Sequence, residues 1–357
     1  MRYKSIDFLR FIAVFLVLLR HFDFQNINNV GSSLYFIFNY FQQIGWIGVD
    51  LFFVISGFLV SGLIFDEIDK KNDFNAKQFL IRRGFKIYPS FYFLIFCTSS
   101  IFILKNKFVA NPFVNEIFYL QNYFKGAWNH TWSLAVEEHF YFFLAILFLI
   151  WKKYKFDYKS LKFLYFLLIC ILLIIFIKRY YMNEISSNNR IIYYTQTRMD
   201  ALLFGVLISL LSKYQLTFFN YWKKYFALPI IIILIPFVFH ISQIEIFDKI
   251  QFEFGYTLLF FFFGNIILFC LHYERIFHKK LFILPIKIGV FSYSIYLWHM
   301  PCKFWVLSYI EKMYKMNYWE KLFIYFLSAF LIGIFFAKII ELPFLKIRER
   351  FFPSNKS

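Results

Sequence analysis

The chain has 357 residues, of which 61% are hydrophobic and only 17% are charged, and its 57 phenylalanines exclude an ordinary soluble or disordered protein. The formal net charge of +18 would suggest nucleic-acid binding in a soluble protein. Here, however, the basic residues lie mostly in short segments between apolar runs, as membrane anchors do, so we expect contact with membrane lipid and no nucleic-acid partner.

Ten apolar windows approach the length of about 17 to 25 residues that crosses a hydrocarbon core. They cover 6–22, 45–65, 84–104, 133–151, 161–178, 200–212, 226–241, 254–271, 288–309 and 322–341. These windows predict an all-α integral membrane protein, a bundle of about ten transmembrane helices. We expect residues 1–357 to form a single transmembrane domain with no appended soluble domain.

Lysines and arginines favour alternate segments between these windows. When the N-terminus is placed in the cytoplasm, the inside segments carry about twice as many of them as the outside segments. The positive-inside rule therefore predicts that both termini are cytoplasmic.

The first window contains two ionisable residues, Arg10 and His21. An ionisable group inside a span costs about 2.5 to 3.5 kcal/mol on insertion scales, so each needs a partner or a function. Eleven residues make about three helical turns, which places both side chains on one face, about 16 Å apart along the axis. Either this face looks into the bundle as a functional surface, or Arg10 snorkels and His21 is an interfacial residue.

The second window begins near Asp50, at a depth similar to that of His21. Asp50 can orient a working imidazole, or it can stabilise the positive N-terminal end of its own helix. Further along, Ser56 and Gly57 indicate close helix packing more than catalysis.

Three cations, Arg82, Arg83 and Lys86, precede Pro89 at the predicted cytoplasmic start of the third window. They can be a positive-inside anchor, which the pattern alone favours. They can equally hold the phosphates of a CoA-type donor, because arginine forks match phosphate oxygens and lysine supplies a point charge.

The fourth window opens with Ser133, a candidate N-cap, followed by Glu137, Glu138 and His139. Capping does not require two adjacent carboxylates and a histidine at a membrane edge, so one of these carboxylates is a candidate partner for His21. For the other polar residues of the spans we expect pairing or kinking; these are Arg198, Asp200, His299 with Pro301 and Lys303, and Glu341 before Pro343.

Taken together and in this order, these motifs resemble the acyltransferase family 3 of bacterial envelope modification, which contains O-antigen and peptidoglycan O-acetyltransferases. The resemblance covers nearly the whole chain. It rests on Arg10 with His21, on residues 50–58, 82–89 and 132–138, on Arg198 with residues 200–202, on residues 292–299 with Pro301, and on residues 341–344.

The resemblance implies an enzyme in the inner (plasma) membrane that moves an acetyl or similar acyl group from cytoplasmic acyl-CoA to a hydroxyl of an envelope polysaccharide or lipid-linked sugar. It also implies that Arg10 and His21 are essential and that the basic motif binds the donor. Acyl-CoA would be a substrate, and no permanently bound cofactor is expected.

Two residues depart from the family pattern. Lys86 stands where the family usually has arginine, so a bidentate phosphate contact is in doubt there although the charge is kept. His139 stands where glutamine is common. The esterase-like domain of some relatives is not expected, so the chain would pass the acyl group to its acceptor itself or to a separate protein.

Our hypothesis from the sequence places the donor nucleotide at Arg82, Arg83 and Lys86, and has Arg10 guide the pantetheine arm. His21 would act as general base, with Glu138, Glu137 or Asp50 holding the imidazolium; an acetyl-imidazole intermediate is the alternative. No metal is required.

A rival hypothesis is a proton-coupled transporter of an anionic solute, with Arg10, His21, Glu137 and Glu138 as a proton relay. Two features count against it: the span pattern has no inverted repeat, and the basic cluster suits a phosphorylated donor.

Overall fold

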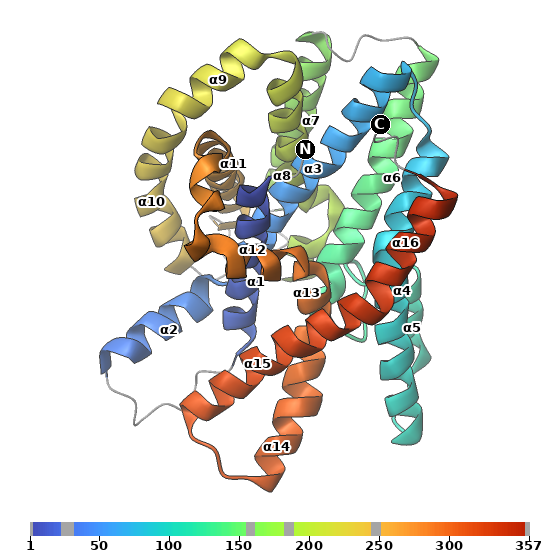
Figure 1. Cartoon of the computed structure of the whole chain (residues 1–357), viewed down its shortest axis with the longest axis vertical. Coiled ribbons are helices and arrows are strands. Elements are labelled where there is room, and N and C mark those ends of the chain that lie inside the picture. The colour runs from blue at the N-terminus through green and yellow to red at the C-terminus, as the bar shows by residue number, and fades with distance from the viewer. Residues whose placement is uncertain (1–2, 23–31, 155–160, 182–188, 244–250, 354–357) are drawn as a thin grey trace. The chain divides into compact units, whose positions relative to one another are not determined.

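The computed structural model describes residues 3–22, 32–154, 161–181, 189–243 and 251–353, and in these ranges it contains helices and no strand (Figure 1). Helices are the expected solution, because a backbone in lipid must satisfy its own N–H and C=O groups. The apolar runs of the sequence supply side chains that tolerate such surroundings. The predicted all-α class is therefore confirmed.

Contacts divide the chain into two compact units. Unit 1 consists of residues 1–49, 86–108 and 274–347, and unit 2 consists of residues 50–85, 109–273 and 348–357. Helix α4 (Ala76–Leu104) runs through the boundary at residues 85 and 86, with Pro89 in its interior.

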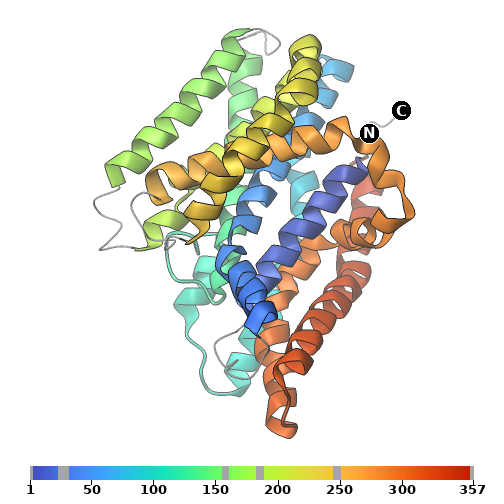
Figure 2. The same cartoon turned by 90° about the vertical axis from the view of Figure 1, so that its left-hand side faces the viewer.

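Unit 1 is built around α1 (Lys4–His21), which packs against helices from the other end of the chain (Figure 2). Its other helices are α2 (Ser32–Ile44), α12 (Ile283–Val290), α13 (Ser292–Pro301), α14 (Ser308–Met313) and α15 (Tyr318–Phe336). Gly289 lets α12 approach closely, because a Cβ there would lie 1.8 Å from the carbonyl oxygen of Asp7.

Unit 2 contains most of α3 (Ile47–Lys71) and the helices between residues 109 and 273. These are α5 (Ala110–Ile117), α6 (Trp132–Lys153), α7 (Leu161–Tyr181), α8 (Thr195–Tyr214), α9 (Leu216–Tyr225), α10 (Ala227–Gln243) and α11 (Tyr256–His272). Helices α3 and α8 touch backbone to backbone. A Cβ on Gly57 would lie 1.9 Å from the oxygen of Leu202, and one on Gly205 would lie 2.2 Å from the oxygen of Val54.

The chain continues from unit 1 into unit 2 through α16 (Leu342–Phe351). The last residues of unit 1, up to 347, and the first residues of the C-terminal segment of unit 2, from 348, both lie in this helix. Short 3₁₀ and π helices connect several of the longer elements. Residues 348–353 thus belong to unit 2, far in sequence from the rest of it.

Loops that the charge pattern assigns to one side of the membrane meet within each unit. In unit 2, Lys213 at the end of α8 pairs with Asp66 and Asp69 at the end of α3. At the opposite end of α8, the Thr195 hydroxyl accepts from Asn122, in the segment between α5 and α6, at 2.9 Å. In unit 1, the backbone N–H of Lys4 donates to Glu274 at 2.7 Å.

Four helical stretches of the described residues are long and apolar enough to cross a membrane: Ile47–Lys71, Ala76–Leu104, Asn129–Lys153 and Tyr318–Phe351. The number is six if two bent pairs each form one span. These pairs are Arg190–Tyr214 with Leu216–Tyr225, bent by 115°, and Lys280–Val290 with Ser292–Met313, bent by 65°. The chain is thus a multi-pass membrane protein, and each of the ten predicted windows contains helix.

Candidate active site

Two histidines meet in unit 1. His21 is the last residue of α1, and His299 lies in α13 just before Pro301. The Nε2 atom of His299 is 3.3 Å from Nδ1 of His21, and the ring centroids are 4.9 Å apart. His299 is fully buried, whereas His21 is half-buried.

The contacts of the two rings fix their neutral tautomers. Nδ1 of His21 lies 3.0 Å from the carbonyl oxygen of Val17, and Nδ1 of His299 contacts the carbonyl oxygen of Tyr296. A carbonyl only accepts hydrogen bonds, so both Nδ1 atoms carry the proton. The Val17 carbonyl and Nε2 of His299 then share the one Nδ1–H of His21 as acceptors, and Nε2 of His21 keeps its lone pair.

Lys303 holds the end of α1 in place beside this pair. Its ammonium group donates to the carbonyl oxygen of His21 at 2.6 Å, which satisfies one of the free carbonyls at the C-terminus of the helix. The contact is to the backbone, so it positions the residue.

Arg10 lies three turns before His21 on the unbroken helix α1. The two side chains therefore project within about 20° of each other, as the eleven-residue spacing predicts. The guanidinium of Arg10 is half-buried and 3.7 Å from the carboxylate of Asp7 on the same helix. Asp7 was not among the residues expected to have a role.

Asp50 is paired with Arg198 inside unit 2. The distance from the Arg198 guanidinium to Oδ1 of Asp50 is 2.7 Å, and both side chains are buried. The guanidinium also lies 3.9 Å from the centre of the Tyr256 ring. Nearby in the same unit, the ammonium of Lys178 pairs with Asp200. The described contacts of Asp50 are thus those of a buried ion pair, the role expected for Arg198 and Asp200.

The two glutamates of α6 differ in burial: Glu137 is partly exposed, whereas Glu138 is buried. Glu137 accepts a hydrogen bond of 2.8 Å from the hydroxyl of Tyr141, which in turn lies 3.1 Å from the hydroxyl of Ser56. His139 contacts the hydroxyl of Thr195 at 2.6 Å.

Ser133 lies in the first turn of α6, one residue inside the helix, so the expected N-cap role is wrong. The N-cap position belongs to Thr131, whose hydroxyl contacts Glu116 and the carbonyl of Trp128 instead of a helix N–H.

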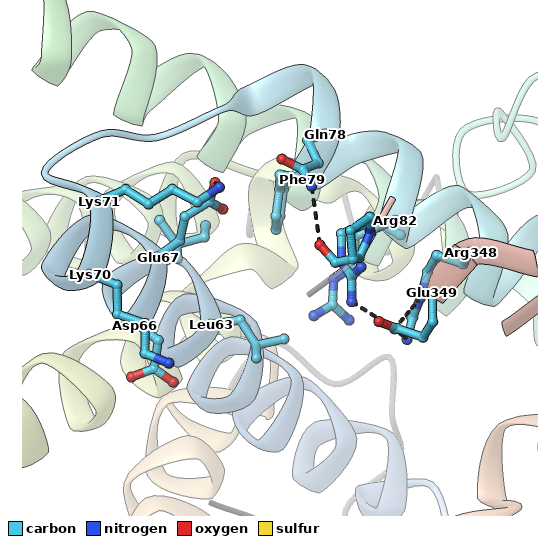
Figure 3. Close-up of a pocket in the computed structure, with 13 residues that line it drawn as sticks. Leu63, Asp66, Glu67, Lys70, Lys71, Gln78, Phe79, Arg82, Arg348 and Glu349 are labelled. Atoms are coloured by element: carbon cyan, nitrogen blue, oxygen red, sulfur yellow. Dashed lines mark hydrogen bonds and ion pairs between the residues drawn. The ribbon is translucent and has the colours of Figure 1, made fainter. Parts of the chain in front are cut away.

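A basic cleft of about 310 Å³ lies in unit 2, between the end of α3, the start of α4 and residues 348–353 (Figure 3). It is lined by Leu63, Ile64, Asp66, Glu67, Lys70, Lys71, Gln78, Phe79, Arg82, Arg83, Arg348, Glu349 and Pro353. Two of the three predicted donor-binding residues, Arg82 and Arg83, are therefore brought together here.

Arg83 connects this cleft with the hydroxyl network of α6. Its guanidinium lies 5.6 Å from the centre of the Tyr141 ring and 6.0 Å from that of Phe79, a geometry that allows cation–π attraction. Among the described residues, no hydrogen bond or ion pair is recorded for this guanidinium.

Lys86, the third predicted donor-binding residue, is not among those that line the cleft. It belongs to unit 1, where its ammonium pairs with the buried carboxylate of Glu341. The other oxygen of Glu341 accepts from the Ser294 hydroxyl at 2.8 Å. The motif is thus divided between two environments one helical turn apart.

Glu116 is a buried carboxyl group that the sequence did not single out. It lies in the last turn of α5, outside the candidate spans, and accepts hydrogen bonds from the Trp128 backbone N–H and the Thr131 hydroxyl, at 3.0 and 2.9 Å. Burial outweighs these donors and raises the pKa of Glu116 to about 7. It thus organises the loop that leads into α6.

For His299 the expected role was pairing or kinking, and Tyr141 and Arg348 were given no part in the site. The available signals for these two were a tyrosine four residues after Glu137 and one more cation in a basic C-terminal segment. Within the described ranges, no three His, Cys, Asp or Glu side chains are placed to share a metal ion.

A family model described as an acyltransferase domain matches residues 3–341. One relative is the Staphylococcus aureus (strain COL) protein named "Putative O-acetyltransferase SACOL0978". It is 28% identical over 387 residues, which cover 97% of this chain and 58% of the relative. The O-acetyltransferase OatA of S. aureus strain NCTC 8325 is 29% identical over 307 residues, covering 78% of this chain and 49% of the relative. The chain thus spans about half of the length of these relatives. No solved structure matches it.

Proposed function

Because the chain belongs to the acyltransferase family 3, whose model covers residues 3–341, we propose that it is a membrane O-acetyltransferase. The donor is acyl-CoA from the cytoplasm, and the acceptor is a hydroxyl of an envelope glycan or of a lipid-linked sugar. Its place is the inner (plasma) membrane. The acyltransferase family and the O-acetyltransferase names of the relatives support this proposal.

The observation that carries the mechanism is the lone pair on Nε2 of His21. Within the described residues, this atom has no recorded partner, and the Val17 carbonyl holds the proton on the other ring nitrogen. His21 is therefore a neutral base with a free acceptor atom, the form that general-base catalysis needs.

In the proposed reaction, Nε2 of His21 takes the proton of the acceptor hydroxyl while that oxygen attacks the thioester carbonyl carbon. The C–S bond then breaks, and the CoA sulfur leaves with the proton from the imidazolium. The products are an ester and CoA, and His21 returns to its neutral form. Protonation at Nε2 strengthens the hydrogen bond from Nδ1 to His299, so His299 stabilises the imidazolium in the place that we had expected Glu137, Glu138 or Asp50 to fill.

The basic cleft is assigned to the nucleotide end of the donor. CoA carries several phosphate groups, and Arg82 and Arg83 offer planar forks that match phosphate oxygens. The apolar walls at Leu63, Ile64 and Phe79 suit the rest of the nucleotide. Arg10 stays assigned to the pantetheine arm, and Glu137 to the network that adjoins Arg83.

The direct test uses purified protein in lipid nanodiscs with acetyl-CoA labelled in the acetyl group. We expect the label to appear on an added envelope glycan and an equal amount of free CoA to form. Uptake of an anionic solute without consumption of acetyl-CoA would support the transporter instead. Mass spectrometry of the envelope glycans from a deletion strain and its parent identifies the acceptor, which should lose acetyl-sized mass units.

A further inference from the structure

The basic cleft of unit 2 contains an acidic segment of the chain itself. The carboxylate of Glu349 accepts from Arg82 at 2.9 Å and from the neighbouring Arg348 at 2.6 and 3.1 Å (Figure 3). A second nitrogen of Arg82 donates to the carbonyl of Phe352, and Gln78 donates to the carbonyl of Pro353 at 3.3 Å. Residues 348–353 thus place three acceptor groups against the start of α4.

The recorded ion pairs of the other carboxylates of the cleft are with lysines. Glu67 pairs with Lys71 at 3.3 Å, and Asp66 pairs with Lys213. Glu349 is therefore, among the described contacts of the cleft, the carboxylate that joins two guanidinium groups. It is also 42% exposed, so a ligand entering the cleft can reach it.

A carboxylate between two arginines has the same recognition chemistry as a phosphate. Both present anionic oxygens that accept charge-assisted hydrogen bonds from guanidinium N–H groups, as one oxygen of Glu349 does here from Arg82 and Arg348. A phosphate monoester, however, carries about −1.5 to −2 charges and three acceptor oxygens at neutral pH. It can therefore replace a carboxylate at such a position, whereas the reverse exchange loses charge.

We propose that Arg348 is a further donor-binding residue, which holds a phosphate of acyl-CoA together with Arg82, and that Glu349 occupies that phosphate position until the donor arrives. This inference rests on the proposed use of acyl-CoA. Arg83 completes the cation set from its place over Phe79 and Tyr141. Binding of the donor turns Glu349 out of the cleft and leaves Arg348 in it.

The test is CoA binding to the purified full chain in nanodiscs of phosphatidylcholine, measured by isothermal titration calorimetry for wild type and five variants, one of which is Arg83→Ala. Arg348→Ala should weaken CoA binding by about tenfold or more, the usual loss for a charge-assisted contact. Glu349→Gln removes the competing charge, so it should tighten CoA binding by about two- to fivefold, the range of an exposed ion pair.

Two matched controls come from the same elements. Arg350→Ala removes the next cation of α16, which is exposed and does not line the cleft. Asp69→Asn removes a carboxylate of α3 that does not line the cleft and pairs with Lys213. Neither should change CoA affinity as much as the variants at 348 and 349. Thermal unfolding of each variant checks that it is folded.

A basic cleft can also take a lipid phosphate, so the titrations are repeated in nanodiscs containing phosphatidylglycerol. CoA affinity that is unchanged by that lipid supports the donor assignment, while loss of CoA binding in its presence assigns the phosphate position to lipid and overturns the inference. Equal CoA affinity in wild type, Arg348→Ala and Glu349→Gln, with binding still weakened by Arg83→Ala, also overturns the inference but keeps the proposed function. Wild-type protein that binds no CoA removes the proposed function itself.

Discussion

The pairing of His21 with His299 leads to the first prediction at the scale of single residues. His21→Ala should lower kcat by about 10²- to 10⁴-fold, the usual contribution of a general base. His299→Leu should lower kcat less, because the base remains while its partner for the imidazolium is lost. Since neither residue lines the basic cleft, the KM for acetyl-CoA should change little in both variants.

His299→Gln is the informative companion variant, because its side-chain oxygen can still accept from His21. It should recover part of the kcat lost in His299→Leu. If both His299 variants have wild-type kcat, the contact between His299 and His21 has only a packing role and no role in catalysis. Turnover by His21→Ala at normal abundance would move the base to another residue.

A pH effect on stability is expected at Glu116. An ordinary glutamate has a pKa of 4.5, whereas the pKa of Glu116 in the folded chain is about 7. Between these two pH values the folded state therefore binds more protons than the unfolded state. The free energy of unfolding should therefore fall by up to about 3 kcal/mol as the pH rises through this window. Unfolding temperatures measured in detergent at pH 5 and pH 7.5 check this.

Glu116→Gln should flatten that pH dependence. An amide can reproduce the protonated acid, since its oxygen accepts from the Trp128 N–H and its nitrogen donates to the oxygen of Thr131. The Thr131 hydroxyl, which donates to Glu116 in the wild type, then directs its proton to the Trp128 carbonyl. A variant that keeps the full wild-type slope would show that other groups cause it.

At the scale of elements, α4 separates two cations that the sequence presented as one motif. Arg83 lines the cleft, whereas Lys86 pairs with Glu341. We therefore expect Arg83→Ala to raise the KM for acetyl-CoA by about tenfold at unchanged abundance. Lys86→Ala should lower stability and leave that KM nearly unchanged, because removing one partner leaves the Glu341 carboxylate buried without its cation.

Lys86→Arg keeps the charge opposite Glu341 and should be tolerated. Donor titrations and thermal unfolding of the three variants provide the measurements. A tenfold rise of KM in a well-folded Lys86→Ala protein would return Lys86 to the donor site.

The contact of α3 with α8 gives another prediction at this scale. In Gly57→Ala, the new Cβ would meet the Leu202 oxygen at 1.9 Å, so the two helices must separate, at a cost of about 1 to 3 kcal/mol. In Gly62→Ala, on the same helix, the nearest atom is Ser209 Oγ at 3.3 Å, so this variant should be close to wild type. The unfolding temperatures of both in detergent decide; equal values would contradict the packing argument.

The sequence predicts relative positions within one helix, but it does not predict which helices contact one another. Within one helix, spacing sets relative position, so the shared face of Arg10 and His21 could be derived from a repeat of 3.6 residues. Between helices, spacing carries no information about which faces meet. The partners of Asp50, Lys86 and His21 therefore could not be derived, although each needed a partner.

At the scale of the whole molecule, membrane topology is the property to test. Loops that the charge pattern puts on one side meet within unit 2, at Lys213 with Asp69 and at Asn122 with Thr195. Reporter fusions after Lys153 and Lys280 should therefore indicate the cytoplasm, and a fusion after Lys125 should indicate the outside. A reversed pair of signals would place the basic cleft on the side without acyl-CoA.

Whole-molecule features were predicted unevenly. The apolar composition predicted a helical membrane protein, because soluble proteins do not have so high a share of hydrophobic residues. Four helical stretches of the described residues meet the length and hydropathy expected of a span, and the number is six if the bent pairs α8–α9 and α12–α13 each form one span. A bend depends on how neighbouring helices pack, which a hydropathy window does not record. The number of ten spans and the cytoplasmic termini stay predictions.

The segment at residues 348–353 has a consequence for inhibitor chemistry. It displays the groups that the basic cleft accepts: one carboxylate held by two arginines, and carbonyl oxygens held by Arg82 and Gln78. A small compound that carries an acid and an amide carbonyl at similar positions would copy these contacts without a nucleotide. The chain thus provides a starting pharmacophore for compounds that compete with its donor.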